Sequence, residues 1–128
     1  MKAIVVHGPR DMRIEEIAED PVLPGTVRVQ IASGGICGSD LHYYQDGGYG
    51  TVRISEPLIL GHEISGHVTE LGDGVTDLAI GDLVAISPSR PCHDCTYCRD
   101  GAFKHCLNMR FYGSAMPTPH IQGAFREN

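Results

Sequence analysis

Several features that would place a protein in a membrane, outside the cell or on nucleic acid are missing from this sequence. No apolar run is long enough to cross a bilayer, so no membrane partner is expected. The apolar stretch AIVV near the N-terminus is too short for a signal-peptide core, which predicts a cytoplasmic protein. The formal net charge is −6 and lysine and arginine form no basic stripe, which argues against a nucleic-acid partner.

A glycine-rich dinucleotide fingerprint is also absent. The nearest approach to GxGxxG is GDGVTD at residues 72–77, but Asp77 stands in place of the third glycine, and the segment joins two predicted strands. We interpret it as a turn, so no Rossmann nucleotide-binding domain is expected in these residues. The length of 128 residues fits one globular unit with one core.

Hydrophobic periodicity predicts mainly β structure. In TVRVQIA, residues 26–32, the apolar Val27, Val29 and Ile31 alternate with polar residues, as in a half-buried strand. The same pattern, with turns rich in glycine and proline between its segments, is weaker at residues 2–7, 11–17, 63–71 and 82–87. Short strands joined by such turns indicate an antiparallel barrel or sandwich.

One short helix is predicted at SDLHYYQDGG, residues 39–48. Ser39 or Asp40 could cap its first turn, and Gly47 could end it. Ser39 and His42 are three positions apart, which places them on one helical face if the turn forms. Residues 87–109 show neither the helical nor the strand period of apolar residues. We expect them to form a loop that is organised by something other than a hydrophobic core.

Four of the five cysteines form the pattern CxxCxxCx7C: Cys92, Cys95, Cys98 and Cys106. Two-residue gaps let successive sulfurs reach one ion, and the fourth sulfur closes a tetrahedral shell. Because a cytosolic chain keeps its thiols reduced, we predict a structural zinc in this lobe, about residues 88–110. A thiol redox centre and an iron–sulfur cluster are alternative uses of such cysteines. His93 and His105 lie in the lobe and are interpreted as solvated loop residues.

The fifth cysteine, Cys37, has candidate partners downstream in His62 and Glu63. A lone cysteine or histidine is usually a core or surface residue, but these three supply the mixed ligands of a catalytic zinc with an open fourth position. Neighbours in a regular strand point to opposite faces, so His62 and Glu63 could bind one ion only where the chain bends. Gly61 and Gly66 could permit such a bend.

These motifs, in this order, resemble the zinc-dependent medium-chain alcohol and polyol dehydrogenase family. GHExxGxxxxxGxxV, from Gly61 to Val75, looks like the zinc signature of that family; CGSDLH precedes it, and GDLVAI and the four-cysteine lobe follow. The lobe, CGSDLHYY and the closing RFYGSAMPTPHIQGAFRE are most similar to the sorbitol and L-idonate dehydrogenase branch.

The resemblance covers nearly all 128 residues and carries expectations about fold and domains. It implies a mainly β, GroES-like, partly open barrel with one or two short helices and a zinc-stapled loop lobe. It also implies that residues 1–128 form an incomplete zinc-binding catalytic domain, and that the Rossmann domain of the family is absent from this chain.

The resemblance further implies roles for individual residues. Cys37, His62 and Glu63 match the catalytic zinc ligands of the polyol branch. Ser39 and His42 match a relay that carries the proton of the substrate hydroxyl toward solvent. Two further positions match residues near the substrate: Tyr43 and Phe111.

Two classes of function follow from these expectations. In the first, the chain is the zinc-binding catalytic portion of an NAD(P)-dependent polyol or sugar-acid dehydrogenase. It would hold two Zn²⁺ ions, would be inactive alone, and would use NAD or NADP only in a complete enzyme that forms a homodimer or homotetramer. In the second, it is a zinc-stapled binding module without catalysis. The number of zinc ions distinguishes the two classes, and self-association through exposed strand edges is expected in either.

Overall fold

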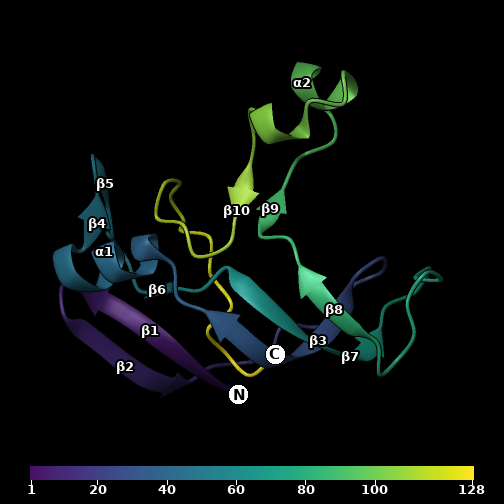
Figure 1. Cartoon of the computed structure of the whole chain (residues 1–128), viewed down its shortest axis with the longest axis horizontal. Coiled ribbons are helices and arrows are strands. Elements are labelled where there is room, and N and C mark those ends of the chain that lie inside the picture. Colours follow the sequence, from purple (N-terminus) through teal and green to yellow (C-terminus); the bar gives the residue numbers. More distant parts are fainter.

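The computed structural model describes all 128 residues and consists mainly of short strands, as predicted (Figure 1). The strands are β1 (Lys2–Gly8), β2 (Asp11–Glu16), β3 (Val27–Gly35), β4 (Gly48–Tyr49), β5 (Val52–Arg53), β6 (Leu58–Ile59), β7 (Glu63–Leu71), β8 (Leu83–Ile86), β9 (Ser89–Arg90) and β10 (Arg110–Phe111). The helices are α1 (Gly38–Asp46), α2 (Thr96–Arg99) and a 3-10 helix (Phe103–His105). None of the helices combines the length and the apolar character that a membrane crossing requires.

Two antiparallel three-stranded sheets form the body of the molecule. Their strand orders are β2-β1-β6 and β3-β7-β8, and two-stranded ribbons are formed by β4 with β5 and by β9 with β10. The sheets do not join into a closed barrel, so each keeps two end strands: β2 and β6 in one sheet, β3 and β8 in the other. In the longest ladder, Val29 of β3 lies opposite Val68 of β7, and Gly35 lies opposite Glu63 at its end. That end of the ladder sets the position of Glu63.

The C-terminal segment ties β1 and β6 to the connection that leads into β7. Gly123 donates its N–H to the carbonyl of Ile59 at 2.7 Å, and Phe125 donates to Leu60 at 2.9 Å. Phe125 in turn accepts a bond from Ile4 in β1 at 2.8 Å, and Ala124 donates to Gly61 at 3.0 Å. Residues 59–61, which lead into β7, are therefore held in place by backbone hydrogen bonds, and these bonds set the position of His62.

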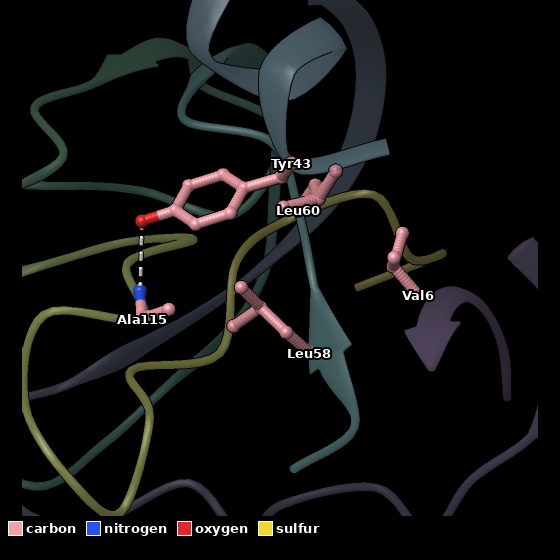
Figure 2. Packing of buried hydrophobic residues seen from close by; sticks show 5 residues of the cluster. All are labelled: Val6, Tyr43, Leu58, Leu60 and Ala115. Carbon is pink, nitrogen blue, oxygen red and sulfur yellow. Dashed lines mark hydrogen bonds between the residues drawn. The ribbon is translucent and has the colours of Figure 1, made fainter. Parts of the chain in front are cut away.

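A small core lies under α1 (Figure 2). It contains the buried residues Val6, Tyr43, Leu58, Leu60 and Ala115. The Tyr43 hydroxyl accepts a hydrogen bond from the backbone N–H of Ala115 at 3.0 Å, so the ring packs in the core while its polar end is satisfied. Full burial of a leucine such as Leu58 contributes about 2 kcal/mol. The core thereby anchors α1 against β1 and the C-terminal segment.

Two local predictions are corrected by the structure. The helix exists and ends at Gly47 in the left-handed conformation as expected, but its N-cap is Cys37, not Ser39 or Asp40. Asp40 lies one turn in, and its carboxylate accepts the backbone N–H of Cys37 at 2.9 Å, which satisfies a donor that the helix leaves free. Residues 87–109 are not a plain loop, because β9, α2 and the 3-10 helix lie within them.

Candidate metal centre

Cys37, His62 and Glu63 come together in the structure although 24 residues separate the first two in sequence. The sulfur, one imidazole nitrogen and one carboxylate oxygen all lie within 4.8 Å of one another. Ligands of one tetrahedral zinc lie about 3.5 Å apart, so small side-chain movements would complete the geometry. Three different elements supply them: the N-cap of α1, the connection after β6 and the first residue of β7.

The chain bends at the point where neighbouring residues 62 and 63 must reach one ion. Gly61 has a φ of 92°, which is costly for any residue with a side chain. His62 therefore precedes the regular strand, which starts at Glu63, and the alternation rule does not apply to the pair. Gly66 does not contribute, contrary to prediction. It sits within β7, where a side chain would collide with the backbone of Gln30, so it serves close packing of β3 on β7.

Gly35 leaves the space into which the Glu63 carboxylate folds. The two residues face each other across the β3–β7 ladder. A Cβ at position 35 would overlap a carboxylate oxygen of Glu63 and would lie 3.1 Å from its Cβ. The absence of a side chain at Gly35 thus allows Glu63, although exposed, to lie over the end of β3, two residues from Cys37.

Asp40, considered in the sequence only as a possible cap, connects the elements that carry the ligands. Its carboxylate accepts the N–H of Cys37 at 2.9 Å and the N–H of Gly61 at 3.2 Å, and lies 3.7 Å from Nδ1 of His62. Asp40 is 3 % exposed. A carboxylate behind a ligating histidine orients the ring and fixes which nitrogen is free to bind. The three-residue spacing of Cys37 and Asp40 could indicate the cap contact between them. Only the fold shows that the same carboxylate also lies against residues 61 and 62.

The donor set fits a zinc ion. His62 is 8 % exposed, and its Nδ1 is the buried side-chain polar atom that lacks a hydrogen-bond partner. Nδ1 faces the Asp40 carboxylate from 3.7 Å, so a small movement would pair these two groups and leave the other ring nitrogen, Nε2, for a cation. Sulfur, nitrogen and oxygen donors from three residues match a zinc site that keeps one position for water or substrate.

The predicted relay residues lie on α1, one turn apart, but do not bond to each other. Ser39 is half-buried, and its hydroxyl has no hydrogen-bond partner. His42 is well exposed, and its Nδ1 lies 3.4 Å from the carboxylate of Asp46. The shared helical face is as predicted, and the relay itself stays a prediction.

The two predicted substrate residues have different surroundings. Phe111 lies beside the metal centre, with its ring centroid 5.3 Å from that of His62. Tyr43 is 2 % exposed and belongs to the core cluster, and burial raises the pKa of its hydroxyl. The observed contacts of Tyr43 are structural, and its role near a substrate stays a prediction.

The second cluster contains the other four cysteines, all of them free thiols: Cys92, Cys95, Cys98 and Cys106. The sulfurs of Cys92 and Cys106 are 3.5 Å apart, compared with about 3.8 Å for two thiolates on one tetrahedral zinc. Backbone N–H groups also point at the sulfurs, for example from Asn108 to Cys106 at 3.3 Å. His93 and His105 are exposed, as predicted.

The cysteine lobe has opposing pKa shifts that a bound dication would resolve. The backbone N–H of Asp94 and then the side chain of Asn108 lower the pKa of Cys92 to about 6, because both stabilise a thiolate. Burial raises the pKa of Cys98 to about 12. Without a cation, the four thiols would therefore not all ionise at neutral pH, whereas a coordinating metal ion deprotonates its thiol ligands. The four cysteines of the lobe therefore fit a closed four-thiolate metal site, which stays a prediction.

Comparison with known proteins identifies relatives over nearly the whole chain. L-idonate 5-dehydrogenase (NAD(P)(+)) of Escherichia coli K12 is 45% identical over 97% of this chain and 35% of its own length. Sorbitol dehydrogenase of Bacillus subtilis 168 is 37% identical over 98% of this chain and 34% of its own length. The crystal structure of L-idonate 5-dehydrogenase from E. coli K-12 superposes with a TM-score of 0.91 at 44% identity, covering 98% of this chain and 36% of that one.

The chain thus spans about a third of the length of these relatives. The similarity in structure confirms the GroES-like, open β architecture that the motifs imply. The family model for the alcohol dehydrogenase GroES-like domain matches residues 23–128, which include both clusters of side chains that could hold a metal ion. This chain belongs to the alcohol dehydrogenase GroES-like domain family.

Proposed function

We propose that this chain is the zinc-binding catalytic portion of an NAD(P)-dependent polyol or sugar-acid dehydrogenase similar to L-idonate 5-dehydrogenase. The observation that carries the proposal is the convergence of Cys37, His62 and Glu63. A purely structural role would be met by the four-thiolate lobe alone. A second cluster with only three protein ligands leaves a coordination position for a substrate oxygen.

Different residues of this chain would have different roles around that coordination position. When bound, zinc supplies Lewis acidity that eases loss of a proton from a substrate hydroxyl, and a nicotinamide accepts the hydride. Asp40 accepts the backbone N–H of Cys37 with one oxygen, and with the other, 3.7 Å from Nδ1 of His62, it would orient the imidazole ring. Ser39 and the exposed His42 would pass the proton to solvent from one face of α1. Phe111 would form an apolar wall beside the His62 ring.

The complete enzyme would add what this chain does not contain. No GxGxxG segment occurs here, so the nicotinamide would be held by a separate nucleotide-binding unit. We propose NAD or NADP as that cofactor, a polyol or sugar acid as substrate, a homodimer or homotetramer as the assembly, and the cytoplasm as the location. The chain by itself would bind two zinc ions and would not turn over substrate.

Metal stoichiometry tests the proposal against the scaffold alternative. We expect two zinc ions per chain, one of them removed by a chelator at much lower concentration, because three mixed ligands hold zinc less tightly than four thiolates. His62→Ala should abolish the labile zinc only. His67→Ala is the matched control, because His67 is an exposed histidine of β7 whose ring forms a hydrogen bond only with the carbonyl of Gly81. One zinc per chain, unaffected by His62→Ala, would favour the scaffold.

A second test asks whether Glu63 binds zinc directly. Gly35→Ala places a methyl group where the Glu63 carboxylate lies, and should weaken the labile site as strongly as Glu63→Gln. Gly34→Ala is the matched control, because a Cβ at the adjacent position meets only ordinary contacts, the nearest at 3.6 Å. Equal zinc affinity in both glycine variants and in the parent would remove Glu63 from the ligand set.

A further inference from the structure

A cavity whose wall is largely apolar but carries several arginines lies on the other face of the β9–β10 ribbon. In β10 and the residue after it, Phe111 faces the His62 ring, while its neighbours Arg110 and Tyr112 line this cavity of about 950 Å³. Successive residues of a strand point to opposite faces, which accounts for the division. In Figure 1 this ribbon lies between β8 and the lobe that contains α2. The cavity is therefore distinct from the metal centre.

Two arginines with no charge partner face each other across this ribbon. Arg90 and Arg110 are direct register partners in the antiparallel pair, so their side chains leave the same face. Both line the cavity. Neither guanidinium forms an ion pair or a hydrogen bond within the chain. Like charges directly opposite each other destabilise a sheet unless an anion lies between them.

Two further residues of the cavity wall, Tyr112 and Arg126, add orientation and positive charge. The guanidinium carbon of Arg90 lies 5.8 Å from the ring centroid of Tyr112, an arrangement that restrains the arginine on the aromatic face. Arg126 contributes a third guanidinium, which lies 3.3 Å from the carboxylate of Asp20, the one acidic residue in the lining. Three arginines against one aspartate leave this cavity cationic on a chain whose net charge is −6.

We propose that this cavity binds a small oxyanion, of the carboxylate or phosphate class, between Arg90 and Arg110. A planar guanidinium donates paired N–H groups that match two oxygens of such a group. Two guanidiniums on one face can therefore grip an anion from both sides, and the anion removes their mutual repulsion. The proposal rests on the cavity and the register of the ribbon and is independent of the proposed catalytic function.

The test measures thermal stability of the zinc-loaded chain; phosphate or gluconate replaces chloride stepwise at constant ionic strength, and sorbitol is added at the same concentrations with the chloride unchanged. The compounds are inorganic phosphate, D-gluconate as a sugar acid, and sorbitol as its neutral counterpart. Phosphate or gluconate should raise Tm saturably, and sorbitol at the same concentrations should not. Stabilisation by phosphate alone or by gluconate alone identifies the anion class that the site prefers.

Three variants tie the effect to its site. Arg90→Gln and Arg110→Gln should each weaken anion binding about tenfold or more, because each removes a charge-assisted pair of hydrogen bonds. Both should also leave the anion-free protein as stable as the parent or more stable, because the repulsion across the ribbon is gone. Arg13→Gln is the control: Arg13 is an exposed strand arginine paired with Asp11, and its loss should leave anion binding unchanged.

Binding at the zinc ion would mimic the effect, so the series is repeated in His62→Ala, where anion stabilisation should persist. The proposal is overturned if His62→Ala abolishes the stabilisation, or if Arg90→Gln and Arg110→Gln respond to anions as the parent does. It is equally overturned if neither anion stabilises the parent saturably.

Discussion

Replacing Asp40 by asparagine should disrupt both the fold around α1 and the metal centre. The carboxylate is 3 % exposed and accepts two backbone N–H groups, from Cys37 at 2.9 Å and Gly61 at 3.2 Å. An asparagine of nearly the same shape offers one acceptor oxygen, and its amide NH₂ must face the other donor. One backbone N–H is then left unsatisfied in a buried position.

The expected cost follows from these two contacts. Losing one hydrogen bond to a charged acceptor and burying an unpaired donor costs about 2 to 4 kcal/mol. For a chain of this size the melting temperature should fall by about 10 °C. Because the same carboxylate lies 3.7 Å from Nδ1 of His62, the labile zinc should also bind about 10 to 100 times more weakly.

The assay separates these two effects. Urea unfolding with only the labile zinc removed and the lobe zinc kept gives the hydrogen-bond cost, and chelator competition on the zinc-loaded protein gives the change in affinity. Asp46→Asn is the control, because Asp46 lies on the same helix but is 65% exposed and pairs only with His42, so the loss should stay below about 1 kcal/mol. Unchanged unfolding free energy and unchanged zinc affinity in Asp40→Asn would refute the role assigned to this carboxylate.

Four further outcomes are expected. Tyr43→Phe should destabilise the chain by about 1 to 3 kcal/mol in chemical unfolding, because the buried N–H of Ala115 loses its acceptor; an unchanged midpoint would contradict this. Cys95→Ser should remove the tightly held zinc and lower the melting temperature strongly, since structural zinc contributes about 10 to 16 kcal/mol in small peptides; full metal content in the variant would exclude the structural site. Acid should release the lobe zinc: hydrogen bonds lower the pKa of Cys92 from the ordinary range of a thiol to about 6, so its thiolate persists at neutral pH and is protonated as the pH falls through 6. Zinc affinity measured between pH 7.5 and 5 should therefore decrease, and a flat profile would argue against thiolate ligation. Finally, the chain alone should produce no NADH from sorbitol, L-idonate or a simple alcohol, and calorimetry should detect no saturable NAD binding, because nothing positions the hydride acceptor.

The sequence was sufficient where the information is local. Period-two alternation located β3 and β7, and the glycine at position 47 ended the helix where expected, because strand faces and helix caps depend on near neighbours. The CxxCxxCx7C spacing indicated the four-cysteine cluster for the same reason: its ligands lie within one short segment, so few backbone conformations bring the sulfurs together. The spacing of Cys37, His62 and Glu63 did not by itself establish them as one group of metal ligands. The family resemblance predicted that they are.

The tertiary structure decided everything that depends on contacts between distant segments. Asp40 could be recognised as a candidate cap, but only the packing of α1 against residues 59–61 shows that the same carboxylate reaches Gly61 and His62. By the local strand rule, the side chains of His62 and Glu63 would point to opposite faces and could not bind one ion. The positive φ of Gly61 bends the chain there, so that His62 precedes β7 and the rule does not apply to the pair. The sequence places Arg90 and Arg110 twenty residues apart with no common pattern, and only the register of β9 against β10 sets one guanidinium opposite the other. Strand register is a property of the whole folded chain, since it is selected by long-range packing and not by the residues of either strand alone.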